Sequence, residues 1–326
     1  MTGLHVEGGR VRGVGTAFGL LYEGRAVVLA TGTYLGSRVF LGTASFPSGP
    51  MGQPPSLALS GDLARRGLRM RRMRTDTTPR LHLDSLDTKE LVAQGSAAEP
   101  LAFSLWNEGR VYEGYACYLT RSNEATHDLV RRNLDRSPLS MGWMESSGPR
   151  YCPSIEDKVL RFPERGSHLV FLEPVSAGNR EVYMQNFSTS LPFDVQLEMV
   201  RTLPGCSRAH ITRPGYAIEY DALDPTQLAP SLEVKALPGL FCAGQINGTT
   251  GYDFLNQLNG LFIDGEGAWC LDRFYVEFSG NTEAFKEIAY TQKKRALTEL
   301  FAGEMNALTR RLGYLAEEDR HGCDLT

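Results

Sequence analysis

The sequence predicts an α/β protein in which a parallel sheet is interrupted by an inserted second domain. Two short apolar strands, VVLATG at residues 27–32 and GLFCAG at residues 239–244, both run into a glycine, and a long region of mixed composition separates them. The chain has 326 residues, of which 42% are hydrophobic and 22% charged, so it can bury a large core and is expected to form two domains.

The N-terminal part is expected to contain strands and then a helix. The stretch LHVEGGRVRGVGTAF alternates around a Gly-Gly pair, which is typical of a hairpin. The stretch LLYEGRAVVLATG predicts a further strand, and residues 27–30 are expected to be buried on both faces, as in parallel strands. SLALSGDLARRGL has helical spacing and a glycine stop.

The composition beyond this part indicates how the domains are arranged. Turn-rich sequence with short helices at THDLVRRNL and DVQLEMVRTL fills the middle, and the stretch KEIAYTQKKRALTELFAGEMNALTRRL has helical periodicity. We therefore expect a first domain at residues 1–80 and an inserted α/β domain at 81–235. The first domain resumes at 236–264, and a helical tail follows at 265–326.

Several classes of protein are disfavoured by composition. No apolar run approaches the roughly 20 residues that a membrane span needs, and the opening residues do not resemble a secretion signal. The six cysteines never form a C-x-x-C pair, which argues against a zinc site or a disulfide framework. A reducing compartment is expected, which means the cytoplasm, or the mitochondrion in a eukaryotic cell.

The arginine-rich stretch LARRGLRMRRMR allows two interpretations. The net charge of -4 gives no global attraction to nucleic acid, so a polyanion would need a local basic patch. Guanidinium groups match phosphate oxygens, but a helix end and a strand with basic solvated faces would give the same pattern. The residues are Arg65, Arg66, Arg69, Arg71, Arg72 and Arg74.

The two glycine-terminated strands predict a ligand site. Ligands of open α/β sheets lie beyond the carboxyl ends of strands, where glycine allows a close approach of the backbone. Gly32 ends the first strand, and polar groups follow the second, together with backbone N–H groups at a predicted helix start. The alternative is that NGTTG forms only a polar turn. The polar stretch contains Gln245, Asn247, Gly248, Thr249 and Thr250.

Cys152 lies in GPRYCPSIEDKVLRF and has two interpretations. Ser154 and Asp157 have the spacing of a capping box, which places Cys152 just before a helix N-terminus. That position and the neighbouring Arg150 favour a reactive thiolate, although free cysteine is also among the most frequently buried residues. Lys158 and Arg161 are candidates for phosphate binding or for a solvated face.

The remaining titratable candidates carry weaker signals. His127 could carry protons, but a lone histidine is more often structural. The other cysteines show no activating pattern, and we assign them to packing. They are Cys117, Cys206, Cys242, Cys270 and Cys323.

Several blocks in the same order, spread over residues 5–252, resemble the glucose-inhibited division protein A (GidA/MnmG) family. They include AVVLATGTYLGSRVFLG, CYLTRSNEATHDLVRRNLDRSP, GPRYCPSIEDKVLRF, RPGYAIEYDALDP and GLFCAGQINGTTGY. The resemblance implies a flavoprotein of the glutathione-reductase type with an inserted domain, in which residues 1–80 are the distal part of the FAD-binding domain and residues 236–264 return to it. It also implies an FAD-dependent enzyme that adds the 5-carboxymethylaminomethyl group to the wobble uridine of tRNA, with NADH as reductant, a partner GTPase and a homodimer.

The resemblance also implies roles for particular residues. Ser56 and Gln245 match positions that contact FAD, with Gly32 and the NGTTG turn beside them, and Cys152 matches a catalytic cysteine. A stretch assigned to the nicotinamide nucleotide corresponds to Gly148, Pro149, Arg150, Tyr151, Cys152, Pro153, Ser154, Ile155, Glu156, Asp157, Lys158, Val159, Leu160, Arg161 and Phe162.

The sequence departs from the family pattern in three places. It begins after the glycine-rich phosphate turn and a second functional cysteine, and it diverges after Tyr252, with only a short tail for the helical C-terminal domain. Asp76 stands where the family has a glycine near the flavin. We therefore expect the chain alone to bind FAD weakly or not at all. There are two alternatives. One is a catalytically silent homologue that binds tRNA or a partner through its arginines, and the other is an incomplete chain without independent activity.

Overall fold

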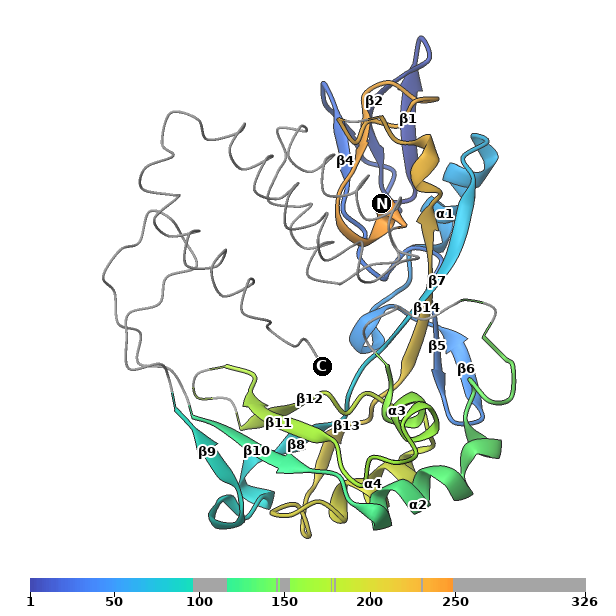
Figure 1. Ribbon diagram of the computed structural model, residues 1–326. Helices are drawn as coiled ribbons and strands as arrows, with labels where there is room; N and C mark the ends of the chain where they lie inside the picture. The colour runs from blue at the N-terminus through green and yellow to red at the C-terminus, as the bar shows by residue number, and fades with distance from the viewer. Residues whose placement is uncertain are drawn as a thin grey trace, which may run out of the picture. The chain divides into compact units, whose positions relative to one another are not determined.

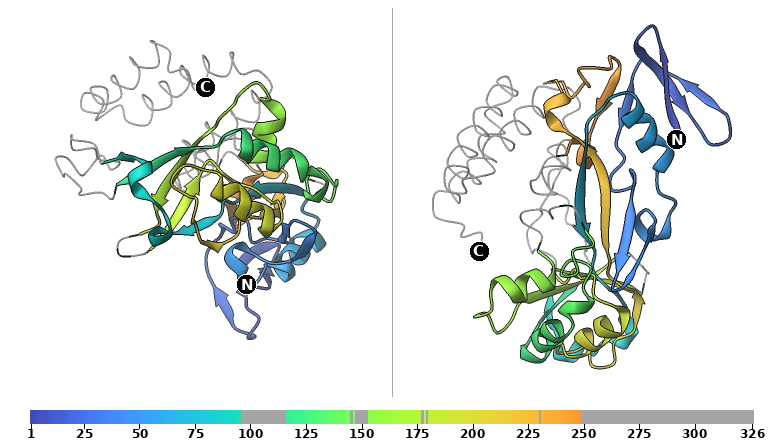
Figure 2. Two further views of the ribbon diagram at one scale, coloured as in Figure 1. Left: turned by 90° about the horizontal axis from the view of Figure 1, so that it is seen from below. Right: turned by 90° about the vertical axis from the view of Figure 1, so that its right-hand side faces the viewer.

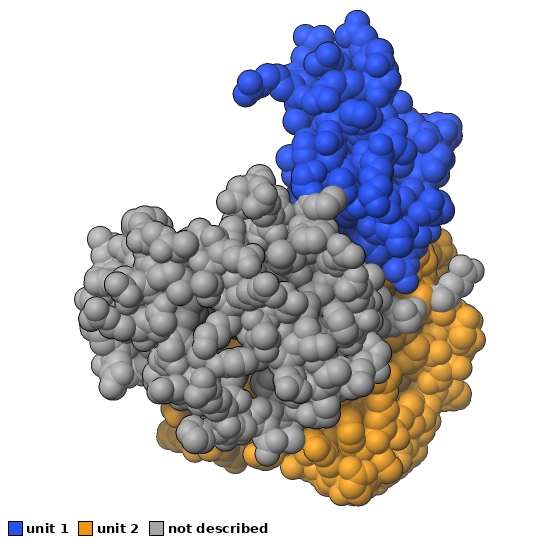
Figure 3. Space-filling model, turned by 45° about the horizontal axis from the view of Figure 1, so that its top comes forward, with its two compact units in different colours: residues 1–35, 56–71, 221–326 blue, residues 36–55, 72–220 orange. Residues whose placement is uncertain are grey.

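The protein has a mixed α/β architecture, seen in a computed structural model that describes residues 1–95, 116–144, 146, 153–176, 178, 180–229 and 231–248 (Figures 1 and 2). The chain forms two compact units (Figure 3). Unit 1 contains residues 1–35, 56–71 and the chain from residue 221 onward, and unit 2 contains residues 36–55 and 72–220. The chain passes between units within β7 (Met70–Asp76) and β14 (Ala217–Leu223). The domain limits at residues 80, 235 and 264 stay predictions.

Unit 1 begins with an antiparallel sheet of β1 (Gly3–Glu7), β2 (Arg10–Gly15) and β3 (Leu21–Glu23). The predicted hairpin is confirmed, because β1 pairs with β2 around Gly8 and Gly9. Both glycines have positive φ, 57° and 76°, as the tight turn of a two-residue hairpin requires.

A second sheet in unit 1 joins the two glycine-terminated strands. β4 (Val27–Leu29) and β15 (Leu240–Cys242) pair in parallel, with Val27 opposite Leu240 and Leu29 opposite Cys242. The predicted strand over LLYEGRAVVLATG is in fact two strands, β3 and β4. The expectation that residues 27–30 are buried on both faces was wrong, because Val28 is 52% exposed while Leu29 is buried. Successive side chains of a strand point to opposite faces, and here only one face packs on the core.

The core of unit 1 lies against α1 (Leu57–Arg65). Leu59 and Leu63 of this helix are buried with Leu29 and Leu240 from the parallel strands. The predicted glycine stop is confirmed, because Gly67 follows the helix with φ 79°. The short 3-10 helices η5 (Pro225–Gln227) and η6 (Gly244–Asn247) complete the described part of this unit's C-terminal segment.

Unit 2 contains a six-stranded antiparallel sheet in the order β13-β8-β12-β11-β10-β9. A four-stranded sheet, β6-β5-β14-β7, includes the two strands that lead to unit 1. Strand bounds are β5 (Arg38–Leu41), β6 (Ala44–Pro47), β8 (Arg80–His82), β9 (Val92–Gln94), β10 (Cys117–Arg121), β11 (Leu169–Pro174), β12 (Glu181–Gln185) and β13 (Ile211–Arg213).

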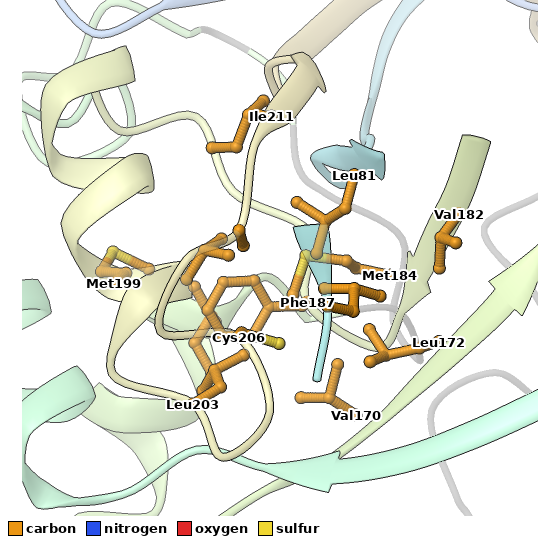
Figure 4. Close-up of a cluster of buried hydrophobic side chains, with 14 of the residues drawn as sticks. Leu81, Val170, Leu172, Val182, Met184, Phe187, Met199, Leu203, Cys206 and Ile211 are labelled. Carbon is orange, nitrogen blue, oxygen red and sulfur yellow. The ribbon is translucent and has the colours of Figure 1, made fainter. Parts of the chain in front are cut away.

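Helices α2 (Glu124–Arg132), α3 (Ile155–Arg161) and α4 (Phe193–Arg201) pack against the six-stranded sheet. Alternate residues of the strands, such as Val170 and Leu172 in β11, point into a core that includes Phe187 and Met199 (Figure 4). The predicted helices at THDLVRRNL and DVQLEMVRTL are confirmed as α2 and α4. The predicted helical tail lies outside the described residues.

One buried polar side chain connects α4 to the turn before β14. Gln196 is fully buried, and its amide nitrogen donates to the backbone oxygens of Leu191 at 2.7 Å and Gly215 at 2.9 Å. Its side-chain oxygen accepts from the Gly215 N–H at 2.7 Å. Gly215 cannot carry a side chain, because a Cβ would lie 2.8 Å from the Thr77 backbone oxygen.

Replacing Gln196 with methionine should lower the free energy of unfolding by about 3 kcal/mol or more, because three buried backbone groups lose their partner. Chemical denaturation measures this effect. The matched control is Gln185→Met at an exposed position of β12, which should change stability little. Equal effects of the two substitutions would contradict the role of Gln196.

Candidate functional site

The carboxyl ends of β4 and β15 form the first candidate site. Because these strands are parallel neighbours, Gly32 and Gln245 come to the same edge of the sheet. A Cβ built at Gly32 would lie 3.7 Å from the Gln245 side-chain oxygen, and Gly32 has φ 51°. The structure therefore brings together two residues that are far apart in the sequence and that were predicted to share a ligand site.

Ser56 belongs to the same part of unit 1. Its backbone N–H donates to the Tyr34 oxygen at 2.8 Å, and it forms a parallel bridge with Leu35, shortly after Gly32. Ser56 precedes α1, but its hydroxyl makes no capping hydrogen bond to that helix. A serine at this position usually caps the helix with its hydroxyl. Because the Ser56 hydroxyl does not, it remains available to a ligand.

The turn after β15 requires glycine at one position. Gly248 has φ 65°, and a Cβ there would lie 2.1 Å from the Leu223 backbone oxygen. Its N–H donates to the Gln245 backbone oxygen at 3.1 Å, which closes η6, and Asn247 is buried within that turn. The neighbouring candidates Thr249 and Thr250 lie outside the described residues.

Thr31 is a member of this site that the sequence reasoning missed. Its hydroxyl is buried and has no hydrogen-bond partner among the described residues. A buried hydroxyl without a partner is uncommon and calls for a water or a ligand. The sequence signal was its position directly before Gly32, at the end of an apolar strand. Thr31, Ser56 and Gln245 fit a polar ring edge, since together they can donate and accept hydrogen bonds.

The second candidate site is the start of α3 in unit 2. The predicted capping box is confirmed: the Ser154 hydroxyl accepts from the Asp157 N–H at 3.1 Å, and the Asp157 carboxylate accepts from the Ser154 N–H at 3.4 Å. The Ile155 N–H donates to the Ser188 oxygen at 2.8 Å. Gly148, Pro149, Arg150, Tyr151 and Cys152 lie outside the described residues.

A buried carboxylate holds the chain just before this stretch. Glu219 on β14 accepts from the Ser146 N–H at 3.1 Å and from its hydroxyl at 2.7 Å. The Arg72 guanidinium lies 3.5 Å from the other Glu219 oxygen. Unit 2 therefore fixes the chain at Ser146 on one side of Cys152 and at Ser154 on the other. Nothing in the local sequence RPGYAIEY predicts that Glu219 is buried or which groups it contacts.

The phosphate-binding interpretation of Lys158 and Arg161 is not supported by their contacts. Lys158 is buried and its ammonium donates to the Asn186 oxygen at 2.6 Å, while Arg161 lies 3.3 Å from Asp157. Both charges thus have partners within unit 2. Val159 packs in the core, whereas Leu160 and Phe162 are exposed.

Acidic groups gather where β7 meets α3. Glu156 is 2% exposed, and one of its oxygens accepts from the Thr189 hydroxyl at 2.9 Å and from the Ser190 N–H at 3.0 Å. Burial raises the pKa of this carboxyl. Burial also raises the pKa of Asp76 to about 7, against a lowering by Arg74, and the charges of Glu156 and Asp157 raise it further.

His127 has a structural role. It is 1% exposed, its Nε2 lies 2.8 Å from the Ser122 hydroxyl, and burial lowers its pKa. His168 is nearby, with ring centroids 5.3 Å apart, and burial lowers its pKa to about 4. Both imidazoles are therefore neutral near pH 7, and this pair explains His127 without a catalytic role.

The cysteines within the described residues behave mainly as packing groups. Cys206 and Cys242 are buried in the two cores, and burial raises the pKa of each to about 12. Cys117 is half-buried, and burial raises its pKa as well. Cys270 and Cys323 lie outside the described residues.

The arginine-rich stretch does not form one exposed basic patch. Arg66 binds Asp62 at 2.9 Å, Arg69 lies 3.4 Å from Asp224, and Arg74 is 5% exposed. Arg72 donates to the Gly36 oxygen at 2.7 Å in addition to its contact with Glu219. Arg72 and Arg74 are therefore not exposed, while Arg65, Arg66, Arg69 and Arg71 are, and of these Arg66 and Arg69 are paired with carboxylates of unit 1.

Together these features define an α/β protein with a candidate ligand site at parallel strand ends in one unit and a capped helix in the other. The chain belongs to the family described as glucose inhibited division protein A, whose model matches residues 1–253. The resemblance found in the sequence is thus confirmed. No helix in the described part of the chain is long and apolar enough to cross a membrane.

Two curated relatives are named tRNA uridine 5-carboxymethylaminomethyl modification enzyme MnmG. The protein from Alkaliphilus oremlandii is 48% identical over 275 residues, which cover 82% of this chain and 44% of the relative. The protein from Syntrophotalea carbinolica is 51% identical over 250 residues, covering 77% and 40%. The chain therefore spans less than half the length of these relatives.

Solved structures of GidA from Aquifex aeolicus are also similar. The form I crystal structure matches with a TM-score of 0.71 and 38% identity, over 84% of this chain and 45% of that one. The form II structure matches with a TM-score of 0.69 and 36% identity, over 84% and 42%.

Replacing Arg72 with alanine should lower the free energy of unfolding by about 2 kcal/mol or more, because buried Glu219 loses its cationic neighbour. Thermal or chemical denaturation measures the change. Arg71→Ala, at the exposed neighbouring position, is the control and should be nearly neutral. If both variants keep wild-type stability, the buried pairing described for Arg72 is wrong.

Proposed function

We propose that this chain carries the flavin-side part of an FAD site and the cysteine segment of an enzyme that modifies the wobble uridine of tRNA. The 5-carboxymethylaminomethyl chemistry is that in the names of its relatives. The observation that carries the proposal is the parallel pairing of β4 with β15, which juxtaposes Gly32 and Gln245. A glutathione-reductase-type arrangement is part of this proposal and fits a parallel sheet whose strand ends hold the ligand.

The residues at the strand ends suit the isoalloxazine ring of FAD. Gly32 leaves room for the ring, and the hydroxyls of Thr31 and Ser56 and the amide of Gln245 can bond its carbonyl and N–H groups. Bound FAD would supply the electrons for the reductive part of the reaction. NADH, as the source of those electrons, is assigned to residues 148–162 by resemblance only.

Cys152 is the proposed nucleophile. Arg150 is two residues away in the sequence, and a cationic neighbour favours the thiolate. A thiolate that adds to the electron-poor ring of uracil activates the neighbouring carbon for substitution. The hydrogen bonds of Ser146 and Ser154, the described residues on either side of Cys152 in the sequence, support this role.

The proposed partners are transfer RNA, a partner GTPase and a second copy of the chain. The catalytically silent alternative, which binds RNA through the arginine-rich stretch, loses support because Arg66, Arg69 and Arg72 already bond to groups of their own units.

Gly32→Val should weaken FAD binding at least about ten-fold relative to the wild-type chain, however weak the latter is. A branched side chain would occupy the space beside Gln245 and would also strain a backbone with φ 51°. Titration followed by flavin fluorescence measures the affinity. Gly166→Val, at a position open to solvent, is the control. Equal affinities in the two variants would contradict the strand-end site.

Cys152 should react with iodoacetamide below pH 8, because a pKa below the roughly 8.5 of a free thiol keeps it ionised. Mass spectrometry after labelling at a series of pH values gives the pKa. Cys206 and Cys242 do not compete, since both are buried, and Cys152→Ser removes the signal. Labelling that rises only above about pH 8 would refute the nucleophile assignment.

A further inference from the structure

Exposed apolar side chains gather at β3, the outer strand of the three-stranded sheet of unit 1, and at the turn before it. Leu20, Leu21 and Tyr22 are 54%, 47% and 59% exposed, and Phe18 in the turn is 91% exposed. Apolar side chains on a soluble surface are usually scattered singly. A run of this density therefore marks a surface that can bind a partner.

The outer edge of β3 also has unpaired backbone groups. Among the described strands, β3 pairs with β2 alone. The Leu20 oxygen accepts from the Thr16 N–H at 2.9 Å, and the Gly24 N–H donates to β2 at 2.8 Å, so the backbone groups of these two residues face β2. Backbone groups alternate in direction along a strand. The N–H and C=O groups of Leu21 and Glu23 therefore point away from β2, to the open edge.

This edge is complementary to a second copy of itself. When two β3 strands pair antiparallel about a two-fold axis at Tyr22, Leu21 of each copy lies opposite Glu23 of the other. All the outward N–H and C=O groups of these residues then form hydrogen bonds. The same register keeps the Glu23 carboxylates of the two copies from lying directly opposite one another, where like charges repel.

The side chains match in the same register. Leu20 and Tyr22 are two residues apart and share one face of the strand. Tyr22 of the two copies would form a pair without backbone hydrogen bonds, which is the pair whose side chains lie closest. Leu20 of each copy would lie on the diagonal to Tyr22 of the other, within reach of its ring. These side chains would form one continuous apolar strip across the two copies.

We propose that β3 is a dimerisation strand, at which two copies of this chain join their three-stranded sheets edge to edge. The occupant is a second copy because the edge matches itself in its hydrogen bonds, its charges and its apolar side chains. An edge of this length buries less surface than a permanent dimer needs, so the dimer is reversible and depends on concentration.

This inference supplies a surface for the second copy that was named among the partners. It does not rest on the flavin site, because it makes no use of Gly32, Ser56 or Gln245. A failure of either proposal therefore leaves the other intact, and the affinity for FAD, measured separately, distinguishes the two.

Sedimentation velocity of the full chain at concentrations up to about 200 µM tests the proposal. The wild-type chain should show a reversible monomer–dimer equilibrium. Leu21→Pro should weaken the dimer at least about ten-fold, because each dimer loses two hydrogen bonds while the bonds between β3 and β2 remain. Tyr22→Lys should weaken it as well, because it places like charges at the two-fold axis. Val92→Ser, at an exposed apolar position of β9, is the control and should dimerise as the wild type does.

Disulfide cross-linking tests the register. In Tyr22→Cys the two introduced thiols lie opposite one another and should form a disulfide between copies on oxidation. Leu20→Cys has a similar exposure on the same face, but its two thiols would lie about 13 Å apart along the strands and should not cross-link. Mass spectrometry of the cross-linked peptides separates this disulfide from those of the natural cysteines.

Three results would overturn the proposal. The first is a wild-type chain that stays monomeric over the whole concentration range, and the second is a dimer that neither Leu21→Pro nor Tyr22→Lys weakens. The third is equal cross-linking of the two cysteine variants. Flotation with phosphatidylcholine vesicles is measured beside these experiments, and vesicle binding by a monomeric chain would assign the apolar surface to a lipid instead.

Discussion

The parallel pairing of β4 with β15 is the interaction on which the proposed ligand site of unit 1 depends. Three residues on each strand, opposite one another from Val27 and Leu240 onward, bring two distant parts of the chain to one sheet edge. The pairing is stabilised on one face by the core around α1. Because the two glycine turns follow directly, the pairing sets their backbone geometry, which would lower the entropic cost of binding the proposed ligand.

Unit 2 contains a short helix, α3, that is stabilised mainly through the polar groups at its N-terminal turn. The helix α3 has only seven residues, too few to be stable on its own propensity. Its apolar residues Ile155 and Val159 pack into the sheet core, and its carboxylates are bonded to backbone and hydroxyl groups of the Ser188–Leu191 loop and of the helix itself. This explains why four consecutive residues of EDKV, three of them charged, are buried. The helix start is therefore held by packing and by hydrogen bonds together.

The sequence predicted those features that rest on local patterns. Gly8 and Gly9 marked the hairpin, Gly67 marked the end of α1, and Ser154 with Asp157 marked the start of α3. The sequence also indicated that the two strands ending on glycine place their ends at one sheet edge, because parallel strands share an edge. It did not indicate which polar side chains that are distant in sequence contact one another. The arginines of residues 65–74 look alike in the sequence, and only the fold shows that Arg72 meets Glu219 while Arg71 meets solvent.

The same limit applies to burial and to the acidic junction. Val28 was misjudged because an apolar residue in a short strand does not reveal whether its sheet is covered on both faces. Asp76 was recognised only as a departure from a family pattern. Its raised pKa arises first from burial, which no sequence pattern expresses, and then from the charges of Glu156 and Asp157, which are distant in sequence.

The central claim is that the ends of β4 and β15 form a flavin site, and its most direct test is an amide NMR titration of the labelled chain with FAD. The account predicts concentration-dependent shifts that are largest at Gly32, Ser56 and Gln245, which lie on three different segments of unit 1. Shifts confined to other residues, with these three unchanged while FAD binds, would contradict it.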